Sequence, residues 1–240
     1  MKRHFVKTSN AEKFMQHIRV ASTSGAVEAR GVIVHGRPGE GKTACLQNYG
    51  SMKEGVFVTG QPDWTVTRMM SRIADRLGLK VDRNLDSKIV QFLSDQENPL
   101  PIIVDEAGFA LLNNAICLEK LRSITDQSYS PLVLCFMSQD IRMLDRYKQL
   151  SSRIATRCEF QKSTIEDVAL MFRSVSEAPV SKGICEVVHE KTDGRMRLIM
   201  NSIARIEQLA KVKKIRDREV NVDDVMGVGL FDDFIVRGAK

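Results

Sequence analysis

Short apolar runs alternate with amphipathic stretches over the first two thirds of the chain. Five of these runs predict strands: residues 31–35, 55–59, 102–104, 131–137 and 158–160. Helical spacing of apolar residues predicts helices between them: residues 8–21, 64–77, 86–95, 115–125 and 141–150, with a further helix after residue 41. This alternation predicts an α/β fold with a doubly wound parallel sheet, which binds its ligand at the carboxyl ends of the strands.

Strand patterns stop near residue 163, and three helices are predicted at residues 164–174, 181–191 and 195–210. Ser9 or Asn10 is expected to cap the first helix of the chain, and Ser163 or Thr164 the first of these three. Gly78 is expected to end the helix at 64–77. We therefore predict an α/β core with an N-terminal helix over residues 1–162, followed by a helical lid with a basic tail over residues 163–240.

Composition agrees with a globular protein, because 43% of the residues are hydrophobic and 28% are charged. No apolar segment reaches the length that crosses a bilayer, and no apolar signal core follows the basic N-terminus. We therefore expect a cytoplasmic protein that does not bind membranes. The five cysteines include no C-x-x-C pair and mostly lie in apolar runs, so we expect small buried residues in a reducing compartment and no metal site made by protein side chains alone.

A complete G-x-x-x-x-G-K-[ST] phosphate loop follows the first predicted strand and precedes a helix. In such a loop the backbone N–H groups surround the phosphates, and the helix directs its positive end at the same anion. The lysine adds a charge near the outer phosphates, and the threonine hydroxyl is a ligand for Mg²⁺. The residues expected to bind a nucleoside triphosphate are Gly36, Arg37, Pro38, Gly39, Glu40, Gly41, Lys42, Thr43 and Ala44.

Two carboxylates, Asp105 and Glu106, follow the buried strand predicted at 102–104. Asp105 is expected to hold the Mg²⁺ shell through water, together with Thr43. Glu106 is expected to orient and polarise the attacking water, because phosphoryl transfer depends on positioning and charge neutralisation. Taken alone, an Asp-Glu pair after a strand is an ordinary polar turn, and the phosphate loop upstream favours the functional interpretation.

The order of these motifs resembles the AAA+ ATPases, and within them the DNA-transposition ATPases typified by the Mu B protein of phage Mu. The likeness covers most of the chain and is carried by the phosphate loop and by residues 5–8, 103–107, 118–127, 131–134, 150–154 and 192–199. The resemblance implies ATP and Mg²⁺ as cofactors, and slow ATP hydrolysis stimulated by assembly, DNA or a partner. It also implies a bacterial or phage-infected host cell.

The resemblance implies roles for four further residues. Ser138 would sense the γ-phosphate at the end of the fourth core strand, although an incidental serine at a strand end looks the same. Arg153, with Arg157 in reserve, would reach the nucleotide of a neighbouring subunit; a solvated or helix-capping arginine is the alternative. Arg197 would contact the phosphates from the lid.

Adenine recognition is poorly marked in the sequence. By the same resemblance, Phe5 and Val6 would pack on the base, but an apolar anchor for the N-terminus has the same pattern. The single tryptophan, Trp64, fits packing within the core or the lid better than stacking on a base.

Lys and Arg number 36 against 30 Asp and Glu, a surplus of +6 that permits nucleic-acid binding without indicating it. Positive charge gathers near the C-terminus, where the residues expected to contact DNA phosphates are Lys211, Lys213, Lys214 and Arg216. A solvated helix end is the alternative. The resemblance implies a homo-oligomer, either a ring or a helical filament, on double-stranded DNA without strong sequence preference, and a transposase as partner.

Three other functions remain open at this stage. One is an AAA+ switch or scaffold that acts on a protein partner, and another is an origin-binding or helicase-loading ATPase. Against the latter we expect too few residues after Ala210 for a winged-helix domain. A small-molecule kinase leaves Arg153, Arg157 and residues 194–197 unexplained.

Overall fold

The computed structural model describes residues 2, 4–23, 30–215 and 218–226, with the backbone alone at Asn113. The chain divides into two compact units. We call Lys13–Pro38 with Lys42–Phe160 the core unit, and Met1–Glu12 with Gly39–Gly41 and Gln161–Lys240 the helical unit. Sequence order alone suggested a division after residue 162, whereas in the structure the first twelve residues and three residues of the phosphate loop group with the C-terminal helices.

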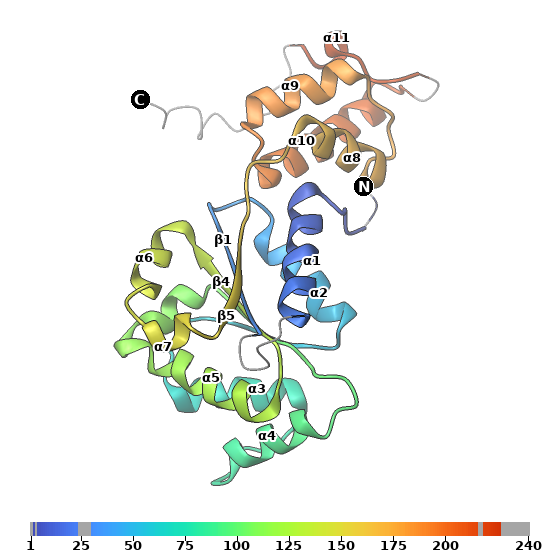
Figure 1. The fold of residues 1–240 in the computed structure, drawn as a ribbon. Helices are drawn as coiled ribbons and strands as arrows, with labels where there is room; N and C mark the ends of the chain where they lie inside the picture. The colour runs from blue at the N-terminus through green and yellow to red at the C-terminus, as the bar shows by residue number, and fades with distance from the viewer. Residues whose placement is uncertain (1, 3, 24–29, 216–217, 227–240) are drawn as a thin grey trace. The chain divides into compact units, whose positions relative to one another are not determined.

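A five-stranded parallel sheet forms the centre of the core unit, with strand order β2-β3-β4-β1-β5 (Figure 1). Its strands are β1 (Gly31–Gly36), β2 (Val56–Thr59), β3 (Ile102–Asp105), β4 (Leu132–Met137) and β5 (Ile154–Glu159). In the central strands β3 and β4 nearly every residue is buried, because helices cover both faces of a doubly wound sheet. The predicted α/β fold is confirmed.

Helices and 3₁₀ turns connect these strands. The helices are α1 (Ser9–Ser22), α2 (Lys42–Met52), α3 (Val66–Leu77), α4 (Leu85–Ser94), α5 (Ile116–Ser128), α6 (Ile141–Leu144) and α7 (Lys148–Ser151). The 3₁₀ turns are η1 (Ala107–Leu111), η2 (Asn113–Ala115) and η3 (Ser138–Asp140). Gly78 adopts φ +68 and ends α3, as predicted. Trp64 is 4% exposed and lies in the core among apolar side chains, which confirms its expected packing role.

Several boundaries differ from the sequence-based expectations. The helix predicted at 141–150 is divided into α6 and α7 by a turn, and α5 ends three residues after the predicted helix at 115–125. β5 starts at Ile154, four residues before the predicted strand. Its residues 154–157 are only partly buried because β5 is an edge strand, and their mixed polarity conceals the strand pattern. Ser9 is the first residue of α1 rather than its cap.

The helical unit contains α8 (Ile165–Val175), α9 (Lys182–Thr192), α10 (Met196–Val212) and the short α11 (Val222–Val225), which the sequence did not predict. Thr164 caps α8, and its hydroxyl oxygen accepts the Asp167 N–H at 3.2 Å, as expected. An apolar cluster joins α8, α9 and α10, and Val6 lies within it at 5% exposure. Val6 therefore serves as the apolar anchor that was the alternative to base packing. No helix in the described parts of the chain is long and apolar enough to span a membrane.

Candidate nucleotide-binding site

Lys42 is the first residue of α2 and is 7% exposed. Its Nζ donates to the carbonyl oxygens of Gly36 and Arg37, at 2.8 and 2.7 Å. The lysine side chain therefore folds back along its own loop, and its ammonium group lies at the carboxyl end of β1. This is the edge of the sheet at which doubly wound folds bind phosphates.

Thr43 and Asp105 meet at this same edge. The Thr43 hydroxyl donates to Asp105 Oδ2 at 2.7 Å, although 62 positions separate the two residues in the sequence. Asp105 is 4% exposed, and its Oδ1 accepts the N–H of Glu106 at 3.0 Å. A hydroxyl and a carboxylate are the oxygen ligands that Mg²⁺ prefers, so the two side chains fit the predicted metal site.

Glu106 differs sharply from its neighbour. It is exposed, adopts φ +52, and its carboxylate has no ion pair or hydrogen bond within the described parts of the chain. Gly60, which follows β2, donates its N–H to the carbonyl oxygen of Asp105 at 2.8 Å, and a Cβ on Gly60 would lie 2.4 Å from the Glu106 carbonyl oxygen. The left-handed turn at Glu106 is thus packed against a glycine, and it leaves the carboxylate available for water.

Cys135 on β4 is one of five free and buried cysteines, as the sequence predicted. Burial raises the pKa of its thiol, and the charge of the nearby Asp105 carboxylate raises that pKa further. The pKa of Cys45 on α2 is likewise raised, to about 12, by burial and then by Cys158. These thiols stay protonated and act as small apolar groups behind the site.

Ser138 follows β4 directly and is exposed. In the parallel register Met137 pairs with Gly36, the first residue of the phosphate loop, and Lys42 Nζ lies 3.8 Å from Met137 Sδ. The structure therefore brings Ser138 beside the start of the loop. Asp140 holds this turn, because its Oδ2 accepts the Met137 N–H at 3.3 Å.

In the helical unit, the first turn of α10 packs on Gly39–Gly41. The Arg197 N–H donates to the Gly39 carbonyl oxygen at 3.1 Å. Gly41 has φ +87, and a Cβ at this position would lie 2.2 Å from Met196 Sδ. The glycine is thus required twice, by its backbone angle and by the close approach of the methionine. The Arg197 side chain is exposed, and Arg195 is exposed as expected.

Comparison with protein families identifies this arrangement. Residues 26–144 match the model of the AAA domain, and they include the phosphate loop, Asp105 and Glu106. The chain contains an AAA-type P-loop ATPase domain. Such a domain binds ATP and implies ATPase activity. The broader resemblance seen in the sequence is confirmed, and the narrower likeness to transposition ATPases stays a prediction.

Solved structures with a fold similar to that of this chain include archaeal proteins. The Aeropyrum pernix ORC2 protein, in ADPNP and ADP complexes, has a TM-score of 0.69 at 16% identity, covering 94% of this chain and 69% of that one. Cdc6p from Pyrobaculum aerophilum has a TM-score of 0.65 at 16% identity, covering 89% of this chain and 65% of that one. The Aeropyrum pernix ORC1 protein in complex with DNA has a TM-score of 0.63 at 16% identity, covering 93% of this chain and 65% of that one. The chain thus spans about two thirds of their length. No curated protein sequence matches it significantly.

Arg153 lies beside the start of β1, at the opposite end of that strand from the phosphate loop. Its carbonyl oxygen accepts the N–H of Gly31, the first residue of β1, at 3.0 Å. The phosphate loop starts at the other end of β1, about 17 Å away along a strand of this length. An arginine side chain does not cover that distance, so Arg153 cannot reach its own phosphate loop.

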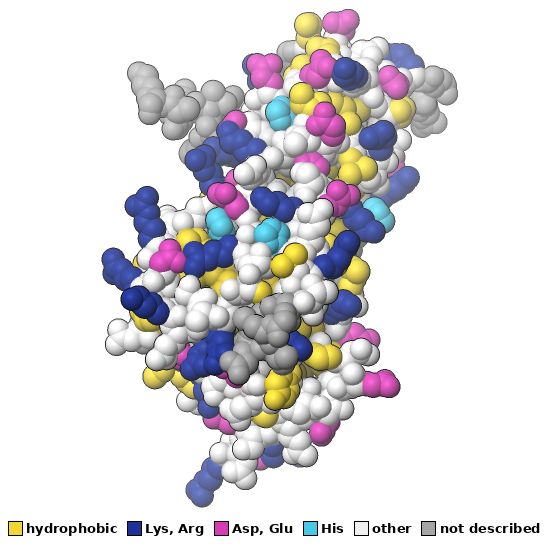
Figure 2. Space-filling model, in the orientation of Figure 1, with side chains coloured by type: hydrophobic (Ala, Val, Ile, Leu, Met, Phe, Trp, Pro, Cys, Tyr) yellow, Lys and Arg dark blue, Asp and Glu magenta, His cyan; other side chains and the backbone are white. Residues whose placement is uncertain are grey.

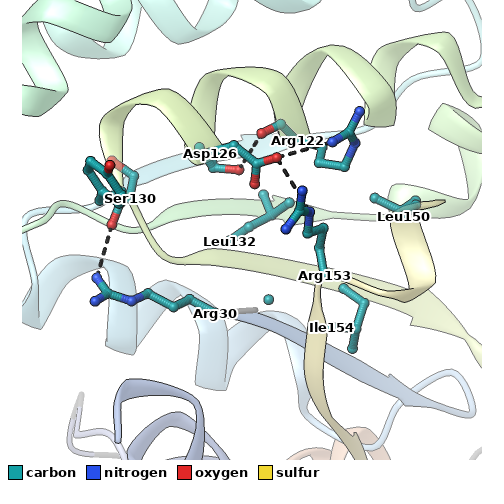
Figure 3. A pocket seen from close by; sticks show the side chains of 11 residues that line it. Arg30, Arg122, Asp126, Ser130, Leu132, Leu150, Arg153 and Ile154 are labelled. Carbon is teal, nitrogen blue, oxygen red and sulfur yellow. Dashed lines mark hydrogen bonds and ion pairs between the residues drawn. The ribbon is translucent and has the colours of Figure 1, made fainter. Parts of the chain in front are cut away.

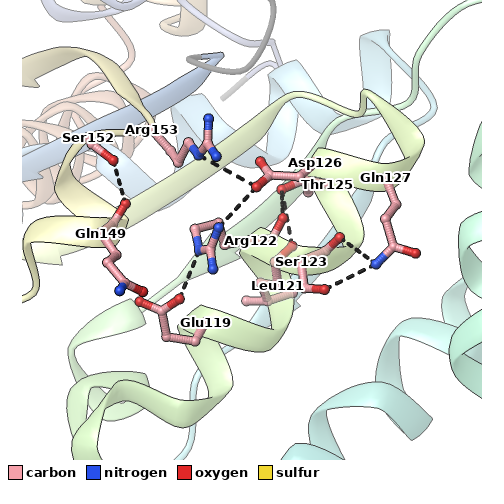
Figure 4. Close-up of polar contacts among 10 residues, drawn as sticks. All are labelled: Glu119, Leu121, Arg122, Ser123, Thr125, Asp126, Gln127, Gln149, Ser152 and Arg153. Carbon is pink, nitrogen blue, oxygen red and sulfur yellow. Dashed lines mark hydrogen bonds and ion pairs between the residues drawn. The ribbon is translucent and has the colours of Figure 1, made fainter.

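The Arg153 side chain takes part in a network on α5 (Figure 4). Its Nε lies 3.5 Å from Asp126 Oδ2, and Arg122 Nη1 donates to the same oxygen at 3.1 Å. Arg122 Nε also donates to Glu119 at 2.8 Å. Sequence analysis missed Asp126 as the partner of Arg153. The spacing of Arg122 and Asp126 by four positions was the available signal, but it could reveal only the contact within the helix.

A small cavity adjoins this network, and Arg30, Arg122 and Arg153 are among the residues that line it (Figure 3). Arg30 Nη1 donates to the Tyr129 carbonyl oxygen at 3.4 Å. The cavity has a volume of about 30 Å³, which is room for one or two waters and not for a nucleotide.

Arg157, the reserve candidate, lies within β5, where it pairs with Ile33 of β1. Its Nη2 donates to Asp145 Oδ1 at 2.7 Å and to the Ser151 hydroxyl at 3.1 Å. The guanidinium group is thus held against the connection between α6 and α7.

The basic tail is only partly available for other contacts. Lys211 Nζ lies 3.0 Å from Glu207 and 3.2 Å from Glu177, and hydrogen bonds to these carboxylates raise the pKa of the lysine. Lys213 Nζ donates to the Asp224 carbonyl oxygen at 2.6 Å. Lys214 is exposed, and Arg216 lies outside the described residues.

Proposed function

We propose that the chain is an ATP-dependent, sequence-nonspecific DNA-binding ATPase that oligomerises on double-stranded DNA and recruits or activates a transposase there. The observation that carries the ATPase part is the meeting of Thr43, Asp105 and Glu106 beside a complete phosphate loop. The DNA part is supported by a solved structure of the same fold, the ORC1 protein in complex with DNA. The transposase part rests on the sequence resemblance.

In this proposal the loop amides and Lys42 bind the phosphates, and Arg197 adds a positive charge from the first turn of α10. Mg²⁺, held by Thr43 and by Asp105 through water, neutralises charge on the phosphates when it is bound. Glu106 orients the attacking water and accepts its proton, because its carboxylate is exposed and unpaired within the described chain. Ser138, which directly follows β4, senses the γ-phosphate in this proposal.

Arg153 supplies the remaining positive charge from a neighbouring subunit. Its separation from its own phosphate loop by the length of β1 supports this role, because an arginine that cannot act in its own subunit can act only in an assembly. Hydrolysis is then slow in the isolated chain and rises with assembly. Arg157 is the second candidate for the arginine that acts across subunits.

An origin-binding or helicase-loading ATPase is the second candidate. Its support is the likeness of fold to ORC and Cdc6 proteins, at 16% identity. Nonspecific and specific DNA binding separate the two candidates, because an origin-binding protein discriminates between base sequences.

The deciding experiment measures fluorescence anisotropy of two labelled duplexes of unrelated sequence with ATP, with ADP and without nucleotide. We expect binding with ATP, at least tenfold weaker binding in the other two conditions, and equal affinity for both duplexes. A marked preference among a panel of duplexes would favour the origin-binding candidate. Absence of DNA binding in every condition would leave an ATPase switch or scaffold that acts on a protein.

A further inference from the structure

Three exposed cations lie close together on the connection from β4 to β5 of the core unit. They are Arg142 on α6, Arg146 in the following turn and Lys148 on α7, and we call them the basic stretch. Figure 2 shows Lys and Arg side chains gathered along the left edge of the core unit, where α6 lies in Figure 1. The sequence analysis did not assign a function to any of the three.

Packing fixes the direction of these side chains. Leu144 and Leu150 are fully buried in the core, and Ile141 and Tyr147 pack against the same cluster. These four apolar residues recur at every third position, so one side of the α6–α7 segment faces the core. The cations occupy the positions between them and are all exposed.

The cations of the basic stretch outnumber the acidic residues beside them, which are Asp140 and Asp145. Asp140 Oδ2 accepts the Met137 N–H, and Asp145 is paired with Arg157. Within the described parts of the chain, none of Arg142, Arg146 and Lys148 has an ion pair. Many other cations of the core unit are paired, such as Lys88 with Asp82 and Lys120 with Asp86.

We propose that the basic stretch binds the phosphodiester backbone of duplex DNA. Uncompensated, exposed Lys and Arg side chains gain most from phosphates, because they release counterions from the DNA without breaking ion pairs of the protein. The α6–α7 segment contains no helix long enough to enter a groove, so its contacts fix position and read no sequence. This inference rests on the proposed DNA-binding function and states where the DNA is bound.

The test compares two variants of equal charge change. The first is Arg142→Gln, Arg146→Gln and Lys148→Gln together. The matched control is Arg76→Gln, Lys80→Gln and Arg83→Gln, three exposed cations on α3 and the α3–α4 connection that also lack ion pairs within the described chain but lie among Asp75, Asp82 and Asp86. Affinity for a labelled duplex is titrated with ATP over a range of salt concentrations, after circular dichroism and ATP binding have confirmed folding.

We expect the first variant to lose at least tenfold in affinity at low salt for every duplex sequence. The slope of log affinity against log salt should fall by up to about 2.7, since each phosphate contact contributes about 0.9. The control should keep the parental slope. The difference between the variants isolates local contacts from the change in net charge.

Each other outcome overturns the inference in a recognisable way. Equal slopes for the first variant and the parent would show that the stretch is a solvated face. Equal losses in both variants would show a diffuse charge effect. Loss of self-association without DNA, measured by light scattering, together with a parental salt slope, would assign the stretch to an acidic surface of another copy. If the parent binds no DNA at all, the proposed function fails first.

Discussion

Two adjacent carboxylates, Asp105 and Glu106, have different surroundings because the backbone places them differently. Asp105 ends β3 and is buried, with both oxygens accepting hydrogen bonds from Thr43 and from the Glu106 N–H. Glu106 turns into the left-handed region and is exposed. A residue held at positive φ without being glycine indicates a conformation that the fold imposes, and here it separates a buried carboxylate from an exposed one. In the proposed function the first holds the metal and the second orients the water.

This division predicts the effect of Glu106→Gln. The amide keeps the size of the side chain but cannot accept a proton, so ATP binding should remain and hydrolysis should fall by a factor of about 100 or more. Binding of a fluorescent ATP analogue and phosphate release measure the two steps separately. Hydrolysis at the parental rate would remove Glu106 from the role of orienting water.

Asp105→Asn is the matched control for that experiment. It removes a charge from the buried position that faces Thr43, so we expect it to weaken the dependence of nucleotide binding on Mg²⁺, which Glu106→Gln should leave unchanged. The two variants together distinguish metal binding from water activation.

Much of this site was predictable because its residues are contiguous in the sequence. The phosphate loop is one eight-residue pattern, and Asp105 with Glu106 follows one apolar run. The contact between Asp126 and Arg153 was not predictable. It joins α5 to the residue before β5 through two side chains that are 27 positions apart in the sequence. Such pairs depend on the three-dimensional path of the chain and leave no local pattern.

Among the elements, those with strong periodicity were predicted, whereas only the last residues of the edge strand β5 were predicted. β4 is an uninterrupted apolar run buried in the sheet, and its bounds agree with the prediction to within one residue. β5 lies at the edge, where Ile154, Thr156 and Arg157 are half-buried, so half of its strand pattern is polar. The α6–α7 segment has apolar residues at every third position, which a continuous helix and two short turns satisfy equally.

Ion pairing within α10 and its surroundings changes the expectation for the basic tail. Lys211 is held by Glu207 and Glu177, and Lys213 by the Asp224 carbonyl oxygen, so DNA phosphates would have to replace existing partners. Changing Lys211, Lys213, Lys214 and Arg216 together to alanine should lower the salt slope by less than the variant of the basic stretch does. A decrease of about 3.6, or about 0.9 for each of four phosphate contacts, would instead make the tail the principal DNA contact.

The whole molecule combines a core unit built around a parallel sheet with a helical unit. In the core unit, the phosphate loop and Arg153 lie at opposite ends of β1. In the helical unit, Gly39–Gly41 pack against Met196 and Arg197 at the start of α10. Each unit thus contains part of the phosphate loop together with residues far away in the sequence.

The position of Arg153 predicts that hydrolysis depends on assembly. Arg153→Ala should bind ATP normally, because the side chain is a strand's length from its own phosphate loop, and should lose about 10³-fold of the hydrolysis that rises with protein concentration or DNA. Lys42→Ala should lose ATP binding but keep Arg153. Mixing the two inactive variants should restore part of the activity, because Lys42→Ala subunits supply Arg153 to intact nucleotide sites.

Phosphate release over a range of mixing ratios measures this recovery of activity, with Arg157→Ala as the parallel variant. If assembly is confirmed by light scattering and no mixture is active, Arg153 does not act across subunits, and rescue with Arg157→Ala alone would transfer the role to that residue.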